Sequence, residues 1–225
     1  MPRRDDGRAM TPLLSSAAMA RQMRCELPTW DDVYDLARGL AYRVADDRFR
    51  PDLLVAIGRG GYTPGRLLAD FLHRKALTAF RIEHYTAGAE KQAQARVVGS
   101  LDDDLSGLRV LVVDDVNDSG ETLQTAVGFL GDRGAAAVKT AVLQEKATTG
   151  FGADYAAQRV EEWRWIVYPW AVIEDATAFL RRMDPRPEGA AEAVRRLAEE
   201  YGMRLPERTA EDVFRLWPED GEGRA

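Results

Sequence analysis

The chain has 225 residues, enough for one α/β domain and a modest extension, and its 45% hydrophobic content allows a packed core. Its net charge of −6 lacks the basic footprint of a general nucleic-acid binder, and no apolar run approaches the roughly 20 residues that span a bilayer. The single cysteine, Cys25, excludes an intramolecular disulfide and suits a reducing compartment. We therefore expect a cytoplasmic protein that binds neither nucleic acid nor membrane.

The first elements follow a weakly patterned N-terminus. Residues 1–25 are expected to be a disordered tail or the result of a start codon assigned too early, because their apolar stretch is interrupted by polar residues. Thr29 and Asp32 have the spacing of a capping box, ahead of an amphipathic helix that ends before Pro51. Residues 52–58 form an apolar run typical of a strand buried on both faces, and a helix is expected from Thr63-Pro64.

Strands and helices continue to alternate along the chain. We expect strands at 77–83, 108–113, 137–143 and 165–167, a helix after residue 118, and a long loop at 86–107. Two helices are expected after Pro187, the second capped by Thr209 and Asp212. This order predicts an α/β fold with a mostly parallel twisted sheet, flanked by helices, that binds ligands at the carboxyl ends of its strands.

The segment 112–122 carries the chemistry. It reads as a strand that ends in two acids, Asp114 and Asp115, followed by a short loop and a helix. Unpaired N–H groups at a helix start favour a phosphate, Ser119 and Thr122 add hydroxyl donors, and Gly120 allows close approach. The two acids are suited to a sugar diol or to a hydrated Mg²⁺. The segment therefore predicts a phosphate site beside a diol or metal clamp.

The acids of this segment also allow other interpretations. Asp114 and Asp115 can simply end a buried strand, with Asp118 capping the next helix. A response-regulator receiver also pairs acids at a strand end, but at its first strand and with a later phospho-acceptor Asp that is not found here. No G-x-x-x-x-G-K-[ST] motif occurs. His73 and His84 lack metal-ligand spacing and are interpreted as structural or exposed.

Residues 112–122 resemble the 5-phosphoribosyl-1-pyrophosphate (PRPP) motif of type I phosphoribosyltransferases: an apolar strand, two acids, then Asp-Thr/Ser-Gly-x-Thr. The resemblance extends from about residue 30 to residue 170 and favours the 6-oxopurine branch, the xanthine-guanine and hypoxanthine phosphoribosyltransferases. It implies the type I fold for residues 26–184, with a small mobile hood at about 86–107. Residues 185–225 would be a helical C-terminal extension.

The resemblance also implies roles for individual residues. Asp114 and Asp115 would bind the ribose hydroxyls directly or through Mg²⁺, and Asp118 would serve as general base near N7 of a purine. Arg59 would neutralise the departing pyrophosphate. The residues implied to bind PRPP are Arg59, Gly60, Gly61, Asp114, Asp115, Asp118, Ser119, Gly120, Glu121 and Thr122.

Base recognition would rest on a later part of the chain. By resemblance, Lys146 would donate to O6 of the base, while Trp165 stacks on the purine and the backbone of Ile166 reads its edge. The aromatic residues around 165 can equally be core side chains. A lysine donor favours a 6-oxo group over the 6-amino group of adenine. Ala171 stands where bacterial relatives carry a metal-linked acid, which puts a second metal site in doubt.

The expected function is Mg²⁺-dependent transfer of the phosphoribosyl group of PRPP to N9 of guanine, xanthine or hypoxanthine in purine salvage. A transferase for adenine or a pyrimidine, or a non-catalytic PRPP or nucleotide sensor, are the alternatives. Residues 186–225 contain seven Arg and ten acids, so we interpret them as a packing or oligomer element. A homo-oligomer, dimer or tetramer, is expected.

Overall fold

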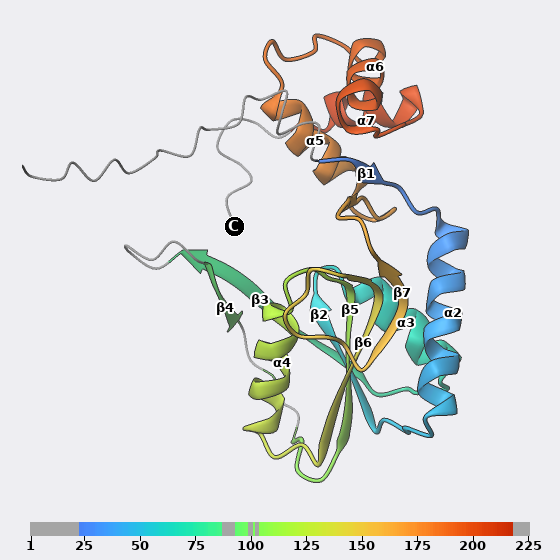
Figure 1. The fold of residues 1–225 in the computed structure, drawn as a ribbon, viewed down its shortest axis with the longest axis vertical. Helices are drawn as coiled ribbons and strands as arrows, with labels where there is room; N and C mark the ends of the chain where they lie inside the picture. The colour runs from blue at the N-terminus through green and yellow to red at the C-terminus, as the bar shows by residue number, and fades with distance from the viewer. Residues whose placement is uncertain (1–22, 87–92, 99–100, 102–103, 218–225) are drawn as a thin grey trace, which may run out of the picture. The chain divides into compact units, whose positions relative to one another are not determined.

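The computed structural model describes residues 23–86, 93–98, 101 and 104–217 (Figure 1). It consists of two compact units, which we call the sheet unit (residues 29–163) and the helical unit (residues 23–28 and 164–217). The tail predicted for residues 1–25 falls outside the described residues up to residue 22, and Cys25 itself lies in a strand. In the described ranges, no helix is both long enough and apolar enough to cross a bilayer.

A six-stranded sheet with the order β4-β3-β2-β5-β6-β7 forms the centre of the sheet unit. Neighbouring strands pair in parallel, except that β4 runs antiparallel to β3. The strands are β2 (Leu53–Gly58), β3 (Leu77–Thr86), β4 (Ala93–Val98), β5 (Arg109–Asn117), β6 (Ala137–Lys146) and β7 (Tyr155–Val160). The mostly parallel α/β sheet predicted from the sequence is confirmed.

Helices cover both faces of this sheet. α2 (Trp30–Asp46) and α3 (Tyr62–Phe71) pack on one face, and α4 (Glu121–Gly131) packs on the other (Figure 1). The capping box is confirmed, because Asp32 N donates to Thr29 Oγ1 (3.1 Å) and Thr29 N donates to Asp32 Oδ2 (2.8 Å). Residues 110–113 of β5 are fully buried, as expected for a central strand between two helical layers.

Two edge strands were not predicted. β4 lies inside the segment 86–107 that the sequence identified as a loop, and β7 had no strand signal. Both lie at an edge of the sheet, where side chains such as Arg96, Gln158 and Arg159 are exposed and little apolar alternation is needed. They are strands because β3 and β6 each offer an unpaired row of backbone groups.

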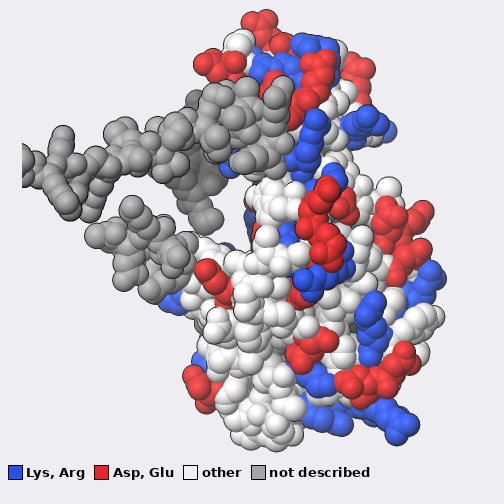
Figure 2. All heavy atoms as spheres, viewed as in Figure 1, with Lys and Arg blue, Asp and Glu red and all other residues white. Residues whose placement is uncertain are grey.

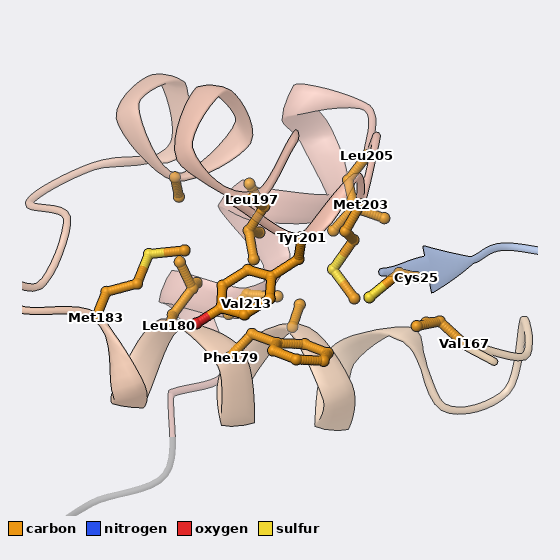
Figure 3. Packing of buried hydrophobic residues seen from close by; sticks show 13 residues of the cluster. Cys25, Val167, Phe179, Leu180, Met183, Leu197, Tyr201, Met203, Leu205 and Val213 are labelled. Carbon is orange, nitrogen blue, oxygen red and sulfur yellow. The ribbon is translucent and has the colours of Figure 1, made fainter. Parts of the chain in front are cut away.

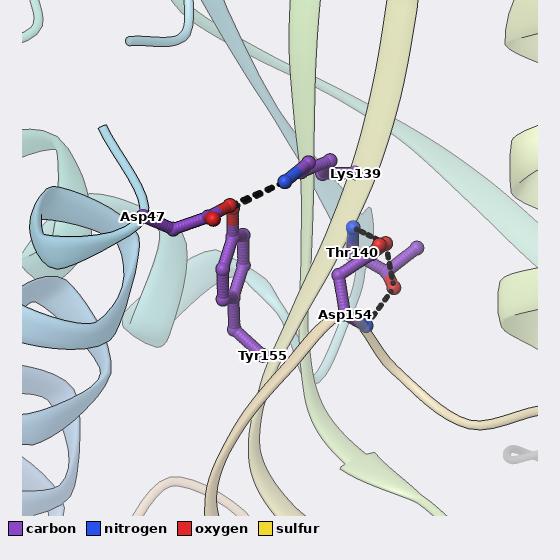
Figure 4. Close-up of polar contacts among 5 residues, drawn as sticks. All are labelled: Asp47, Lys139, Thr140, Asp154 and Tyr155. Carbon is purple, nitrogen blue, oxygen red and sulfur yellow. Dashed lines mark hydrogen bonds and ion pairs between the residues drawn. The ribbon is translucent and has the colours of Figure 1, made fainter. Parts of the chain in front are cut away.

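A polar network joins α2 to the sheet (Figure 4). Asp47, which follows the last residue of α2, accepts from the Tyr155 hydroxyl (2.5 Å) and pairs with Lys139, which also donates to Tyr155 (2.9 Å). Beside it, Asp154 Oδ2 accepts from Thr140 N (2.8 Å) and Oγ1 (3.0 Å). The contacts of Asp47 hold the carboxyl end of α2 against β6 and β7, and those of Asp154 join the start of β7 to β6.

The helical unit has its own hydrophobic core. β1 (Cys25–Glu26) pairs in parallel with β8 (Trp165–Ile166), and the helices are α5 (Val172–Arg182), α6 (Ala190–Tyr201) and α7 (Glu207–Arg215). Figure 3 shows Cys25, Phe179, Leu197 and Tyr201 packed together, with Phe179 and Tyr201 ring centroids 4.5 Å apart. The helices expected after Pro187 are therefore present and form a packed unit with α5.

The start of α7 differs from the prediction. The helix begins at Glu207, directly after Pro206, so Thr209 lies inside it and the predicted cap by Thr209 and Asp212 is wrong. Pro206, with φ fixed at −60°, already directs the chain into the helix without a side-chain cap. The spacing of Thr209 and Asp212 alone does not show whether the two residues cap a helix or lie inside one.

Candidate active site

Two adjacent acids near the carboxyl end of β5 form the floor of the candidate site. Asp114 is only 8% exposed, and its Oδ1 accepts from the backbone N–H of Asp115 (2.9 Å). Asp115 in turn accepts from Val116 N (2.8 Å). Burial raises the pKa of the Asp114 carboxyl well above its usual range, and the neighbouring charge of Asp115 raises this pKa further. A hydroxyl donor or a cation is the partner that such a pair requires.

The loop Arg59-Gly60-Gly61 follows β2 and lies against β5. A Cβ atom on Gly60 would be 2.4 Å from Asp115 Oδ2, and one on Gly61 would be 2.3 Å from the Val113 carbonyl oxygen. Neither position has space for a side chain, whereas Arg59 is exposed. The two glycines therefore let the predicted pyrophosphate loop approach the acidic pair closely, which adds a packing reason to the ligand contact expected from the sequence.

The predicted phosphate loop connects β5 to α4. Gly120 is the N-cap of α4 and has φ 93°, a left-handed conformation that favours glycine. A Cβ atom there would also be 2.5 Å from Phe151 N. Gly120 supplies no side-chain cap to the helix, and Glu121 N donates to Ser119 Oγ over 3.3 Å. The first turn of α4 thus retains the N–H groups and positive dipole end that bind a phosphate.

The loop between β6 and β7 is hydrogen-bonded to the phosphate loop and to the end of β5. Asn117 Nδ2 donates to Glu145 Oε2 (3.0 Å) and to the Phe151 carbonyl oxygen (2.8 Å), and Gly150 N donates to the Ser119 carbonyl oxygen (2.9 Å). Asn117 and Glu145 are both buried. Neither residue was predicted from the sequence to belong to the site. Their polarity at the carboxyl ends of neighbouring strands β5 and β6 was the available signal.

Lys146, Asp118 and Trp163 form a compact cluster beside that loop. Lys146 Nζ donates to Asp118 Oδ2 (2.6 Å), and Trp163 Nε1 donates to Asp118 Oδ1 (3.2 Å). The Lys146 ammonium also lies 4.3 Å from the centroid of the Trp163 ring. The Lys146 side chain is 4% exposed, compared with 46% for Asp118. The structure therefore brings together two predicted residues from distant segments and adds an aromatic residue that was not selected.

Trp165 and Ile166, the predicted base-binding residues, belong to the helical unit. Trp165 packs edge-on against Phe179, with ring centroids 6.1 Å apart, and Ile166 is 8% exposed. Within the sheet unit, the aromatic side chain that contacts Asp118 is Trp163. The pattern of apolar residues could not show which of Trp163 and Trp165 contacts Asp118, because both lie in the same short segment of mixed polarity.

His84 is a further contact of the phosphate loop. Its Nε2 lies 3.1 Å from Thr122 Oγ1, and its Nδ1 lies 3.7 Å from Glu121 Oε2. From the sequence, His84 was interpreted as structural or exposed, and its side chain is 43% exposed. Its place on β3 nevertheless puts the imidazole at the start of α4.

The acidic pair fits a magnesium ion bound together with a substrate. Among the described residues, no group of three or more His, Cys, Asp or Glu side chains is arranged to hold a metal. Mg²⁺ in phosphate-binding sites takes one or two carboxylates and completes its shell with waters and substrate phosphates. Asp114 and Asp115 supply that number of carboxylates.

Comparison with known proteins matches the part of the chain that carries the acidic pair and the phosphate loop. The sequence profile of the phosphoribosyl transferase domain matches residues 26–176. The xanthine-guanine phosphoribosyltransferase of Ruegeria sp. (strain TM1040) is 30% identical over 152 residues, covering 63% of this chain and 82% of the relative. Xanthine phosphoribosyltransferase 1 of Saccharomyces cerevisiae is 28% identical over 183 residues, covering 63% and 87%.

This chain is also similar to solved structures. A purine phosphoribosyltransferase from Pyrococcus horikoshii Ot3 is 30% identical with a TM-score of 0.59, covering 66% of this chain and 94% of that one. A hypothetical protein from Neisseria gonorrhoeae with bound ppGpp is 31% identical with a TM-score of 0.60, covering 66% and 89%.

Proposed function

Because the chain belongs to the phosphoribosyl transferase domain family, we propose that this phosphoribosyltransferase transfers the 5-phosphoribosyl group of PRPP to N9 of a 6-oxopurine. Guanine, xanthine and hypoxanthine are the proposed acceptors, pyrophosphate is the second product, and purine salvage is the proposed role. The relatives named for xanthine, guanine and hypoxanthine support this choice. The observation that carries it is the Lys146–Asp118 pair next to the phosphate loop.

The Lys146–Asp118 pair matches the edge of a 6-oxopurine. In such a base, the O6 acceptor and a protonated N7 lie side by side. The pair offers a donor, Lys146 Nζ, and an acceptor, an Asp118 carboxylate oxygen, 2.6 Å apart. Adenine presents an amino group where Lys146 needs an acceptor, so it would accept no hydrogen bond from the ammonium. The arrangement therefore favours oxo bases.

The phosphate loop and the acids would hold PRPP. Ser119, Thr122 and the N–H groups at the start of α4 would bind the 5′-phosphate, and Asp114 with Asp115 would bind the ribose hydroxyls. Arg59 and the amides of its loop would stabilise the charge on the departing pyrophosphate. A bound Mg²⁺ would add charge neutralisation at the pyrophosphate, with Asp114 and Asp115 holding it directly or through water.

Catalysis then depends on position and on one proton. N9 of the base attacks C1 of the ribose, the C1–O bond breaks, and pyrophosphate leaves with the electron pair. Lys146 and Asp118 orient the base so that N9 faces C1, and Asp118 takes the N7 proton as N9 becomes nucleophilic. An ionised carboxylate has about four acceptor sites, so Asp118 can accept from N7 while it keeps its contacts to Lys146 and Trp163. The hood predicted at about 86–107 lies partly outside the described residues, and its closure would exclude water from the developing cation.

A direct assay tests the proposal. The protein is incubated with Mg²⁺ and PRPP, and pyrophosphate release is measured with guanine, xanthine, hypoxanthine, adenine, uracil and orotate. We expect turnover with one or more of the three oxopurines, and Lys146→Met should reduce it. Turnover with adenine or a pyrimidine alone would instead support the alternative acceptors.

A second candidate is a non-catalytic sensor of PRPP or a nucleotide. The similarity to a Neisseria gonorrhoeae protein with bound ppGpp favours it. Nucleotide binding without turnover of any base would support the sensor. We also propose that the protein works in the cytoplasm and that it forms a homo-oligomer, dimer or tetramer. Light scattering in solution would test the oligomeric state.

A further inference from the structure

Two neighbouring cavities lie at the amino ends of β2 and β3, opposite the strand ends that carry the candidate active site. Their volumes are about 430 and 570 Å³, and Arg74 lines both. The six residues of β2 span about 20 Å between this end and Gly58. The cavities are therefore separate from the acidic pair and the phosphate loop.

Basic side chains dominate the lining. Arg66 pairs with Asp70 at 3.6 Å, and Asp70 is the acid that lines these cavities. Among the described residues, the other lining cations make no ion pair within 4 Å; these are Arg48, Arg50, Arg74 and Lys75. In a chain of net charge −6, such a group is a local exception that favours an anion.

Arg74 gives a second indication. Its Nε is buried and has no hydrogen-bond partner among the described residues. It lowers the pKa of Asp52 only through space, because Arg109 Nε and NH2 already bind the two oxygens of that carboxylate (3.0 and 2.9 Å). A buried guanidinium N–H normally has an acceptor, and a small shift of the Arg74 side chain would let a phosphate oxygen in the cavities supply one.

The backbone gives a third indication. Within the described ranges, Arg48 and His73 are the non-glycine residues with positive φ, at 56° and 52°. Each follows the carboxyl end of a helix, α2 or α3, where glycine usually adopts this conformation at lower cost. Both line the cavities. The chain thus accepts a disfavoured backbone at two positions that bring basic side chains to this surface.

We propose that these cavities form one binding site for a nucleotide. The phosphates would bind Arg74 together with Arg48 and Arg50, and the base would pack on Phe49 and Phe71, which line the larger cavity. Each volume lies in the range of small-ligand sites. Figure 2 shows blue basic side chains along the lower edge of the molecule, with red acidic ones between them, near the carboxyl end of α2 in Figure 1. This site does not depend on the proposed transferase activity.

Equilibrium binding of ATP and of inorganic tripolyphosphate tests the site, using the full chain. Arg74→Gln should weaken ATP binding about 10-fold, the value of one lost charge-assisted hydrogen bond, while Arg38→Gln on the exposed face of α2 should leave it unchanged. ATP should bind more tightly than tripolyphosphate, because only ATP contacts Phe49 and Phe71. Equal affinities for the two would contradict a nucleotide ligand.

Photolabelling separates this site from the candidate active site. With 8-azido-ATP, we expect labelled peptides that contain Phe49 or Phe71, and less label in Arg74→Gln. Label confined to residues 114–122, or ATP binding that Arg74→Gln does not change, would overturn the proposal.

Discussion

Replacing Asp118 by alanine would leave the most buried cation of the candidate site without its anionic partner. The Lys146 side chain is 4% exposed and donates to Asp118 at 2.6 Å, whereas Asp118 is 46% exposed. The charge that remains after Asp118→Ala is therefore the one that water reaches least. We expect this variant to be less stable as well as less active.

The size of the effect follows from the geometry. Breaking a buried ion pair on one side costs about 3–5 kcal/mol. The half-exposed position of Asp118 lets some water enter, and the Trp163 ring at 4.3 Å still stabilises the ammonium by about 0.5–2 kcal/mol. The free energy of unfolding should fall by about 2 kcal/mol, and the Tm by about 4–8 °C for a chain of this size. Asp118→Asn keeps an oxygen acceptor and should lose less stability.

Urea unfolding followed by circular dichroism measures this loss. The matched control is Asp35→Ala, because Asp35 pairs with Arg38 at the same 2.6 Å but on an exposed helix face, where such pairs contribute about 0–1 kcal/mol. Equal stabilities of Asp118→Ala and wild type, or equal losses in the two variants, would refute the reasoning. Asp118→Asn then isolates the chemistry: kcat should fall about 10²–10⁴-fold, with little change in PRPP binding.

Three further predictions concern other parts of the chain. Tyr155→Phe removes the hydroxyl between Asp47 and Lys139 and should lower the free energy of unfolding by about 1 kcal/mol, measured by thermal denaturation. Burial raises the pKa of Asp175 to about 6, so between about pH 4 and 6 the native state binds more protons than the unfolded state and stability falls as pH rises. Asp175→Asn should therefore stabilise the protein by about 1 kcal/mol at pH 7, after allowance for partial exposure, and not at pH 4; a pH-independent effect would contradict this. Burial raises the pKa of the Cys25 thiol to about 12, so a thiol reagent at pH 8 should react with it only in denaturant.

Local sequence determined much of this protein. Residues 110–113 form an apolar run that only a strand covered on both faces can bury, and Asp114 with Asp115 follow it directly. Gly120 marks the turn into α4 because its φ of 93° excludes most other residues. Thr29 and Asp32 fix the start of α2 through contacts only three residues apart. Each of these signals is complete within a few neighbouring residues.

Tertiary structure decided the features that depend on distant partners. β4 and β7 are strands because β3 and β6 offer them free edges, and their own sequences hardly favour that state. Trp163 contacts Asp118 across 45 positions of sequence, and Asn117 reaches Glu145 across 28. Spacing along the chain cannot show which of two nearby tryptophans meets a particular carboxylate. That choice depends on which strands are neighbours in the sheet and on where their ends bring side chains together.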